Sequence, residues 1–273
     1  MSGRFEARVG VVTGGASGLG EATARLMVAE GGSVVIADVH GGRAADAAAR
    51  LGKNAIGLAC DVTNEDDVSR AIDAGVERFG RLDAVFANAG IVGVAGPIAA
   101  TPMDEFDKTM AVLARGVFVT VKHGARAMIA CGNGGAIVCT SSVAGVQGGL
   151  GPHVYSMAKS AVIGLARSAA AELAQHRIRV NAIAPGSIAT AMTAHVIAGD
   201  PEALAQAEER IGAQSPLGRS GMPSDIAETA LFLMTDGGSY ITGQAIVVDA
   251  GQTSGASMSA NWARTAMVIA RPP

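Results

Sequence analysis

Aromatic and charged side chains are scarce in this sequence. Phenylalanine, tyrosine and tryptophan make up 3% of its 273 residues, and charged residues make up 16%. The 21 basic residues nearly balance the 24 acidic ones, and no long basic run occurs, which argues against a nucleic-acid-binding surface. Apolar residues account for 49% of the chain and glycine occurs 37 times. This composition suits helices packed closely on a sheet, with much buried surface.

Cysteine is also rare, and the chain shows no targeting or membrane signal. Cys60, Cys131 and Cys139 are odd in number and lack metal-ligand spacing, so we expect reduced, buried thiols. The five histidines likewise lack metal-like partner spacing, so no metal is expected. The first residues lack a secretory apolar segment, and no apolar run is long enough to span a bilayer. We therefore expect a cytoplasmic protein without a membrane partner.

Short apolar runs alternate with alanine-rich helical stretches along the chain. Apolar runs rich in β-branched residues predict strands at 9–13, 33–38, 55–60, 82–87, 136–140, 178–183 and 245–249. Helices are predicted from the turn after the first strand to 30, and at 64–79, 103–130, 154–175 and 224–234; Asn64 is a candidate helix cap. Apolar strands that are each followed by a helix indicate an α/β fold with a parallel sheet covered on both faces.

The alternation continues to about residue 250 without a linker. We therefore predict one doubly wound domain over residues 1–251 and a C-terminal tail over 252–273, in which a weak helical pattern surrounds Trp262. The segment 187–214 breaks the alternation and is helical in composition. It follows a strand end, where α/β folds bind their ligands, so it is a candidate substrate lid.

A glycine-rich turn, TGGASGLG, lies between the first strand and the first helix. Gly14, Gly18 and Gly20 would let a diphosphate approach the N–H groups at the helix N-terminus, where a Cβ would block it. Ser17 and Leu19, between these glycines, are candidate contacts of the same ligand. The spacing is not that of the common dinucleotide-binding fingerprint, so the turn gains its weight from its position.

Asp38 ends the second predicted strand, and its carboxylate could accept hydrogen bonds from the adenosine ribose of a dinucleotide. A carboxylate would repel a 2′-phosphate, and Val39 and His40, which follow, supply no lysine or arginine to hold one. Ser17, before Gly18, is not basic either. This pattern favours NAD over NADP. The alternative is that Asp38 is only a helix cap or turn residue.

The next two strand ends also carry candidate cofactor contacts. Asp61 and Val62 follow the third strand and are placed to touch the adenine. Asn88, Ala89 and Gly90 follow the fourth strand. Each set alone could be an ordinary turn after a strand, but together they extend the same edge of the sheet.

Tyr155 and Lys159 are four residues apart on a predicted helix and so share one face. Bringing a phenol from a pKa of about 10 to about 7 takes roughly 4 kcal/mol. A lysine ammonium about 4 Å away, at an effective dielectric of about 20, supplies a similar energy. Ser142, after the fifth strand, could hydrogen-bond the reacting oxygen while Tyr155 moves its proton. Each residue alone is unremarkable: a turn serine and a surface pair.

Taken together, these motifs resemble the short-chain dehydrogenase/reductase family. The resemblance covers residues 7–251: the glycine turn, NAG at 88–90, Ser142, Tyr155 and Lys159, RVNAIAPGSIAT at 179–190 and SYITGQAIVVDAG at 239–251. It implies a Rossmann-type sheet of seven strands in the order 3-2-1-4-5-6-7, and hydride transfer between NAD and a carbon bearing a hydroxyl or carbonyl.

The resemblance also implies a role for each matching residue. Tyr155 would be the acid/base, Ser142 would position the oxygen, and Lys159 would hold the nicotinamide ribose and lower the pKa of Tyr155. Tyr155 and Lys159 would thus also contact the cofactor. The residues flanking the nicotinamide carboxamide would be Pro185, Gly186, Ile188 and Thr190.

The sequence departs from the family pattern at Leu113, where an asparagine that takes part in proton transfer is usual. Leucine neither donates nor accepts a hydrogen bond. Either protons reach Lys159 by another route, or the chain mainly binds nucleotide with weak or no catalysis. A smaller departure is Asp249-Ala250-Gly251, where two glycines are frequent.

Substrate and assembly are less strongly specified. The predicted substrate walls lack a basic cluster, which favours a neutral secondary alcohol or ketone, including a cyclic one; the candidate wall residues are Val143, Gln147, His153, Gly186 and Met192. His153 and His195 are either substrate contacts or turn and lid residues. The apolar helices at 103–130 and 154–175 need a covering surface, and in the resembling family they pair subunits, so we expect a homotetramer, a dimer of dimers.

Overall fold

The computed structural model describes residues 3–255. A seven-stranded parallel sheet lies at its centre, in the order β3-β2-β1-β4-β5-β6-β7. This confirms the α/β class and the strand order implied by the family resemblance. The strands are β1 Val9–Thr13, β2 Ser33–Asp38, β3 Ala55–Ala59, β4 Ala84–Ala87, β5 Gly135–Thr140, β6 Ile178–Pro185 and β7 Ala245–Val248.

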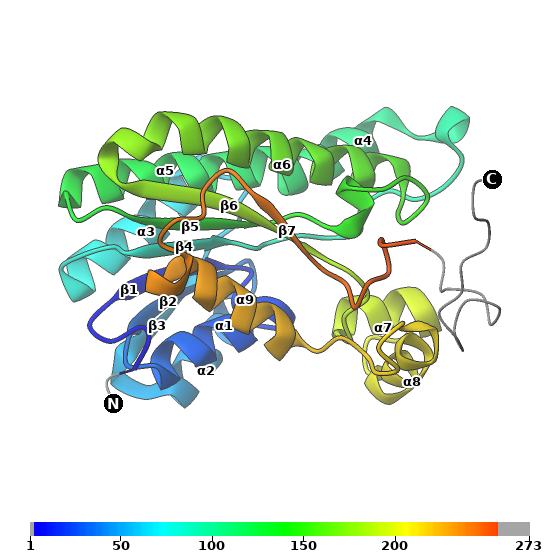
Figure 1. Cartoon of the computed structure of the whole chain (residues 1–273), viewed down its shortest axis with the longest axis horizontal. Coiled ribbons are helices and arrows are strands. Elements are labelled where there is room, and N and C mark those ends of the chain that lie inside the picture. Colours follow the sequence, from blue (N-terminus) through cyan, green and yellow to red (C-terminus); the bar gives the residue numbers. More distant parts are fainter. Residues whose placement is uncertain (1–2, 256–273) are drawn as a thin grey trace, which may run out of the picture.

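Helices cover both faces of the sheet (Figure 1). They are α1 Gly18–Ala29, α2 Gly41–Leu51, α3 Glu65–Phe79, α4 Met103–Met110, α5 Gly116–Cys131, α6 His153–Leu173, α7 Ala191–Ala198, α8 Leu204–Gln214 and α9 Pro223–Met234. Helices α3, α5 and α6 pack on one face, and α1, α2 and α9 pack on the other. Each face has its own apolar core, because successive side chains of a strand point to opposite faces of the sheet.

The predicted elements are present with small shifts at their ends. Asn64 caps α3, since its side-chain oxygen accepts a hydrogen bond from the main-chain N–H of Asp66 at 3.0 Å. Helix α2 was not among the predicted elements, and 187–214 contains the two short helices α7 and α8. The predicted helical pattern around Trp262 lies outside the described residues.

The long helix predicted over 103–130 is interrupted. Residues Ala111–Arg115 form a π-helical turn between α4 and α5. A π turn holds one extra residue within a helix and is frequent at functional sites. Periodicity along the sequence does not reveal it, because α-helical pattern continues on either side.

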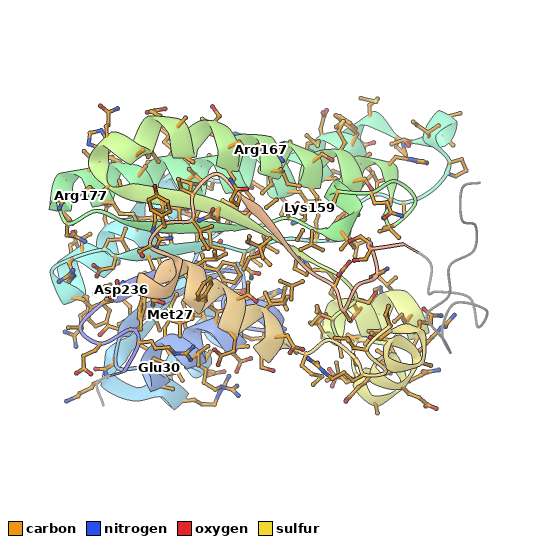
Figure 2. All side chains as sticks on the ribbon, viewed as in Figure 1. Met27, Glu30, Lys159, Arg167, Arg177 and Asp236 are labelled. Carbon is orange, nitrogen blue, oxygen red and sulfur yellow. The ribbon has the colours of Figure 1, made fainter. Side chains whose placement is uncertain are left out.

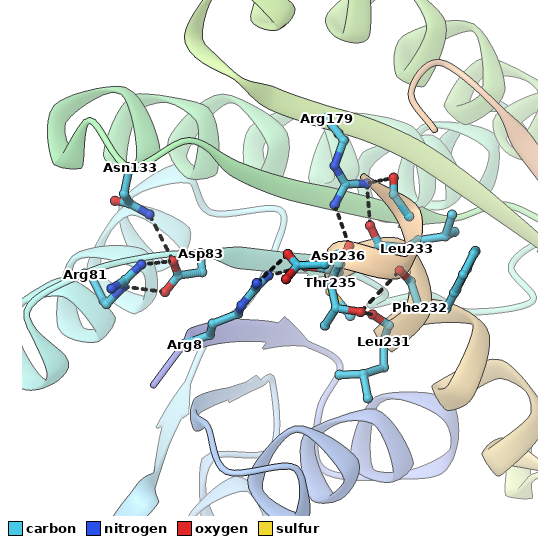
Figure 3. Close-up of polar contacts among 12 residues, drawn as sticks. Arg8, Arg81, Asp83, Asn133, Arg179, Leu231, Phe232, Leu233, Thr235 and Asp236 are labelled. Carbon is cyan, nitrogen blue, oxygen red and sulfur yellow. Dashed lines mark hydrogen bonds and ion pairs between the residues drawn. The ribbon is translucent and has the colours of Figure 1, made fainter. Parts of the chain in front are cut away.

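Polar side chains fasten the edge of the sheet at which the strands begin (Figure 3). Asp83, just before β4, accepts hydrogen bonds from the main-chain N–H of Val9 at 2.9 Å and from the side chains of Arg81 and Asn133. Arg179 on β6 donates to carbonyl oxygens that follow α9, including that of Gly238 at 2.7 Å. The opposite edge, where the strands end, is the edge at which α/β folds bind their ligands.

Candidate active site

A cavity of about 560 Å³ opens along the carboxyl ends of the strands. All the predicted catalytic and cofactor-binding residues line it except Gly20. The predicted residues found on its wall are Gly14, Ser17, Gly18, Leu19, Asp38, Val39, Asp61, Val62, Asn88, Ala89, Gly90, Ser142, Tyr155, Lys159, Pro185, Gly186, Ile188 and Thr190. The cavity therefore brings residues from six strand ends into one site.

The glycine turn presents free main-chain N–H groups to this cavity. Helix α1 begins at Gly18, and the Ser17 side chain makes no capping hydrogen bond. The first N–H groups of a helix have no partner within it, so those of the first turn can meet an anionic oxygen. Gly18 has a φ of +53°, a conformation that favours glycine. These features fit the diphosphate of a dinucleotide.

Gly20, the third predicted glycine of the turn, does not itself line the cavity. A Cβ at this position would lie 2.1 Å from the carbonyl oxygen of Gly14 and 2.9 Å from Nδ2 of Asn88. Glycine is required there for close packing between helix α1 and the turn. Gly20 thus allows α1 to pack closely on Gly14 and Asn88, which line the cavity.

Asn88 holds three strand ends together. Its Nδ2 donates to the carbonyl oxygens of Thr13 and Gly14, each at 3.2 Å, and its Oδ1 accepts from Oγ1 of Thr140 at 3.1 Å. Its side chain thereby links the ends of β1, β4 and β5. Asn88 borders the cavity, but its side-chain bonds all go to protein, so it positions the floor of the site.

Asp38 is only 7% exposed and borders the cavity at the end of β2. Its two carboxylate oxygens accept hydrogen bonds from the main-chain N–H groups of Ala16, at 3.1 Å, and His40, at 3.0 Å. The carboxylate therefore stabilises the turns that contain Ala16 and His40, which is the structural role given above as the alternative for Asp38. Each oxygen keeps a further lone pair for a ribose hydroxyl.

Arg43 also lines this end of the cavity, beside Asp38 and His40. The expectation that no basic side chain lies beside Asp38 is therefore wrong. The residues directly after Asp38 are not basic, but the first turn of α2, a helix that the sequence pattern does not predict, brings Arg43 to the cavity. Other wall residues that went unpredicted as site residues are Cys60, Thr63, Ile91, Val112, Thr140, Ala191 and Thr193.

The candidate catalytic residues lie where β5 ends and α6 begins. Ser142 is buried, and its Oγ accepts a hydrogen bond from the main-chain N–H of Ala144 at 3.1 Å. Lys159 is 3% exposed, lies between α6 and the sheet (Figure 2), and donates from Nζ to the carbonyl oxygen of Thr140 at 2.8 Å. Its Nζ is 5.5 Å from the centre of the Tyr155 ring. Ser142, Tyr155 and Lys159 therefore share one wall of the cavity.

Burial dominates the electrostatics of this group. It raises the pKa of Tyr155 above its usual value, and the nearby Ser142 hydroxyl offsets the rise in part. Burial lowers the pKa of Lys159 to about 8. The spacing of the two residues predicts that Lys159 brings the pKa of Tyr155 toward neutrality. The protein groups alone do not do so, because desolvation of the phenolate outweighs the attraction of an ammonium beyond the ring.

Leu113 is fully buried within the π-helical turn. A Cβ built on Gly90 would lie 3.3 Å from Cδ2 of Leu113 and 3.7 Å from Nζ of Lys159. Leu113 therefore packs behind Gly90, near the ammonium of Lys159. An apolar side chain at this place offers Lys159 no hydrogen-bonding partner.

The candidate substrate walls are only partly correct. Gly186 and Met192 line the cavity, whereas Val143, Gln147, His153 and His195 are not among its lining residues. Thr190 begins α7 with a capping box in which Thr193 is the partner. The segment 187–214 thus borders the cavity through its first residues.

The second departure from the family pattern has a visible consequence. Ala250 adopts a φ of +58°, in the region that favours glycine. Asp249 supports this turn, since its carboxylate accepts hydrogen bonds from the main-chain N–H groups of Gly251, at 2.8 Å, and Thr253, at 2.7 Å.

Among residues 3–255, no helix is long and apolar enough to cross a membrane. In the same part of the chain, no three potential metal ligands lie close together.

Comparison with known proteins identifies similar chains. Residues 14–253 match the family described as "Enoyl-(Acyl carrier protein) reductase". Short-chain dehydrogenase reductase 3a of Arabidopsis thaliana is 41% identical over 254 residues, which are 92% of this chain and 97% of that protein. Momilactone A synthase of Oryza sativa subsp. japonica is 41% identical over 252 residues, 89% of each chain. The crystal structure of levodione reductase superposes with a TM-score of 0.84 at 36% identity, covering 92% of this chain and 99% of that one.

Proposed function

The chain belongs to the short-chain dehydrogenase/reductase family of oxidoreductases, and from this premise we propose that it transfers hydride between NAD and a secondary alcohol or ketone. One observation carries the proposal. Ser142, Tyr155 and Lys159 line the same cavity as the free N–H groups of the glycine turn and the carboxylate of Asp38. A dinucleotide laid along these strand ends would bring its reactive ring to the hydroxyl of Tyr155.

The chain's own residues would handle the substrate oxygen and its proton. When bound, the nicotinamide supplies or accepts the hydride. The Tyr155 hydroxyl exchanges a proton with the substrate oxygen, and the Ser142 hydroxyl holds that oxygen in place. The cation of Lys159 favours the ionised form of Tyr155. The family roles of Pro185, Gly186, Ile188 and Thr190 as flanks of the carboxamide fit their place on the wall.

Asp38 supports NAD as the preferred cofactor. Its carboxylate is fixed at the ribose end of the cavity by two main-chain N–H groups. A 2′-phosphate would be repelled by this charge, whereas a 2′-hydroxyl could donate to it.

The distribution of charge supports a neutral substrate. Asp38, Arg43 and Asp61, together with His40, lie at the adenosine end of the wall, where β2 and β3 end and α2 begins. Among residues 3–255, Lys159 is the only charged wall residue near Tyr155, and its hydrogen bond goes to the main chain. Within this part of the chain, a phosphate or carboxylate substrate would have no cation to pair with. We therefore propose a neutral secondary alcohol or ketone, including a cyclic one, between Tyr155 and the lid segment 187–214.

A second candidate function rests on Leu113. If the site near Lys159 has no route for protons, the chain would bind nucleotide with weak or no catalysis. The burial of Leu113 beside the surface of Gly90 favours this alternative. The presence of Ser142, Tyr155 and Lys159 on one wall favours the enzyme.

A substrate screen separates the two functions. The protein is incubated with NAD⁺ and a panel of secondary alcohols, and NADH formation is followed by absorbance, with NAD⁺ binding measured by calorimetry on the same sample. NADH formation that disappears in Tyr155→Phe supports the enzyme. NAD⁺ binding without turnover of any alcohol, or of the matching ketones with NADH, supports the alternative. Absence of NAD⁺ binding would overturn both.

We also propose a homotetramer, on the evidence of apolar residues on the outer helices. Met103, Phe118 and Met157 are 64%, 54% and 45% exposed, and they come from α4, α5 and α6. Apolar side chains on helices that already cover a sheet are typical of subunit contacts. The division into a domain over 1–251 and a tail over 252–273, the cytoplasmic location and the absence of a nucleic-acid partner stay predictions.

A further inference from the structure

A second cavity, of about 370 Å³, lies beside the cofactor cavity. Its volume is within the range of small-molecule sites, about 300–1,000 Å³. The wall is formed by the segment after β6, the end of α8 with the turn that follows it, the first turn of α9 and the turn after β7. Among the predicted catalytic and cofactor-binding residues only Ile188 lies on this wall, so the cavity is separate from the site described above.

Apolar side chains form much of this wall. Leu217 borders the cavity and is 68% exposed, so a ligand that covered it would remove apolar surface from water. The apolar wall residues belong to α8, β7 and the segments next to them; they are Ile188, Ile211, Pro216, Leu217, Val248 and Ala250. This composition favours a ligand with a compact apolar body.

The charged groups of the wall already have partners. Both terminal nitrogens of Arg219 donate to the carboxylate of Asp225, each at 2.8 Å. The carboxylate of Asp249 accepts three hydrogen bonds, from Gly251 at 2.8 Å and from the main-chain N–H and the hydroxyl of Thr253, each at 2.7 Å. Among residues 3–255 no other charged residue lines the wall. A charged ligand would have to displace one of these partners, so the wall favours an uncharged one.

Neutral polar groups on the wall are free to bind a ligand. Ser187, Gln214 and Gln252 are exposed, and none of their side chains makes a hydrogen bond to another residue within 3–255. Oε1 of Gln252 lies 3.0 Å from a Cβ built on Gly186, which places this amide next to the cofactor cavity. One hydroxyl and two amides offer both donors and acceptors. They fit a ligand that carries a hydroxyl or a carbonyl group.

Ile188 connects the two cavities. Within residues 3–255 it is the one residue that lines both of them. Its side chain faces Gly221 on the second wall, where its Cδ1 lies 2.5 Å from a Cβ built on that glycine. Its carbonyl oxygen accepts a hydrogen bond at 2.6 Å from Oγ1 of Thr193, a residue of the cofactor wall. A ligand in the second cavity would therefore pack against a residue that also borders the cofactor.

We propose that the second cavity is a regulatory site for an uncharged molecule with a compact apolar body and one hydroxyl or carbonyl group. The ligand packs against Ile188 and supplies contacts that hold the shared wall in place, which favours binding of the nicotinamide end of NAD. Tyr155 is not on this wall, so the ligand regulates and does not react. The coupling rests on the proposed function, because it assumes NAD in the larger cavity, whereas the second site itself does not.

Three ligands that share one apolar cage separate the effect of shape from that of charge. At neutral pH 1-adamantanol is uncharged, 1-adamantanamine is a cation and 1-adamantanecarboxylate is an anion. The carbon that bears the hydroxyl of 1-adamantanol has no hydrogen, so this alcohol cannot transfer hydride. Dissociation constants are measured by calorimetry on the full chain as wild type, Gln214→Leu, Leu217→Ala and the control Gln206→Leu. Gln206 is exposed on the same helix α8 but does not line the cavity.

We expect the wild type to bind 1-adamantanol at least about tenfold more tightly than either charged ligand. Gln214→Leu should weaken 1-adamantanol at least about threefold, as expected for the loss of one hydrogen bond. Leu217→Ala should also weaken it, because the apolar contact is lost. Gln206→Leu should change its affinity less than about twofold. Thermal unfolding checks that all the variants are folded.

The coupling is measured with two nucleotides. Saturating 1-adamantanol should lower the Kd of NAD⁺ at least about threefold, and saturating NAD⁺ should lower the Kd of 1-adamantanol by the same factor. The nucleotide 5′-AMP lacks the nicotinamide, so its affinity should be the same with and without 1-adamantanol.

Equal binding of 1-adamantanol by the wild type, Gln214→Leu and Leu217→Ala would overturn the site, as would a failure to bind it at millimolar concentration. Tighter binding of either charged ligand would overturn the uncharged class. Weaker NAD⁺ binding in the presence of 1-adamantanol would show competition in the cofactor cavity, and unchanged NAD⁺ binding would refute the coupling. Absence of NAD⁺ binding under both conditions would refute the proposed function, while weaker 1-adamantanol binding by the two wall variants would still support the second site.

Discussion

The ammonium nitrogen of Lys159 lies 2.8 Å from the main-chain carbonyl oxygen of Thr140, the last residue of strand β5. This bond uses one of the three donors of the ammonium. The surroundings are otherwise apolar on the side of Leu113, and the side chain is almost fully buried. Burial therefore lowers the pKa of Lys159 from its usual value to about 8.

The low pKa of Lys159 predicts an alkaline limit to activity. Below a pH of about 8 Lys159 is charged and favours ionised Tyr155; above it the charge is lost while Tyr155, whose pKa burial raises, is still largely protonated. The rise of kcat/KM for alcohol oxidation with pH should therefore level off above a pH of about 8. Lys159→Arg keeps the charge at all these pH values, so the variant, although slower, should go on rising. A plateau that persists in Lys159→Arg would assign it to another group.

Tyr155→Phe should abolish turnover without weakening the cofactor. The change removes one hydroxyl from a residue on the cavity wall. We expect kcat to fall by at least about 10²-fold, the lower end of what a positioned acid/base contributes. NAD⁺ affinity, measured by calorimetry, should stay within a factor of two. Turnover above one tenth of the wild-type value would contradict the assignment of Tyr155 as the acid/base.

Leu113→Asn should alter proton transfer while leaving cofactor affinity unchanged. Leu113 is buried behind Gly90, and an amide there could donate and accept hydrogen bonds near Lys159. We expect a change in kcat or in the pH dependence of kcat, with the same Kd for NAD⁺. Leu113→Met, which keeps the side chain apolar and of similar size, is the control. Identical pH–rate curves for all three proteins would show that this position plays no part in the proton path.

Ala250→Gly should stabilise the protein. Ala250 holds a φ of +58°, where an L-residue with a Cβ is strained by roughly 1–2 kcal/mol. Part of this gain is lost to the greater freedom of glycine in the unfolded chain, so the free energy of unfolding should rise by about 0.5–1 kcal/mol. Ala245→Gly, in the extended strand β7, should lower it instead. Chemical denaturation measures both, and a loss of stability in Ala250→Gly would show that the turn is not strained.

The assembly prediction is tested by light scattering. A homotetramer at micromolar concentration is expected, and Phe118→Lys should dissociate it by placing a charge on the exposed face of α5. Leu217→Lys is the control, because Leu217 is 68% exposed but lies outside α4, α5 and α6. A wild-type monomer, or equal dissociation by the two substitutions, would contradict the proposed interface.

Much of the fold could be predicted because each strand is a short, mostly apolar run. Val9–Thr13 and Ser33–Asp38 have the bounds that their apolar runs indicate, since both faces of a parallel sheet are covered. The candidate site followed from this, because residues just after parallel strands gather at one edge. Nearly all the predicted catalytic and cofactor-binding residues line one cavity for that reason.

The parts that could not be predicted depend on contacts between distant segments. Arg43 lies on the cavity wall near the start of α2, where Gly41 packs against Ala59 of another element. The raised pKa of Tyr155 reflects burial, which the spacing to Lys159 does not reveal. Gly20 matches the glycine pattern, yet the close approach of Gly14 explains it better than ligand contact does. Sequence spacing thus identifies which residues share an edge but not what each one touches.

The π-helical turn at Ala111–Arg115 also controls the phase of the helix that follows it. Successive residues of an α-helix are rotated by about 100°, so one residue more or less turns everything beyond it by that angle. The π-helical turn absorbs one extra residue, so deleting a single residue from it would restore regular α-helical pairing and leave Met103 on α4 and Phe118 on α5 on their present faces. A change of length by one residue in a regular turn of α4 or α5 would instead exchange the outward face of that helix for another.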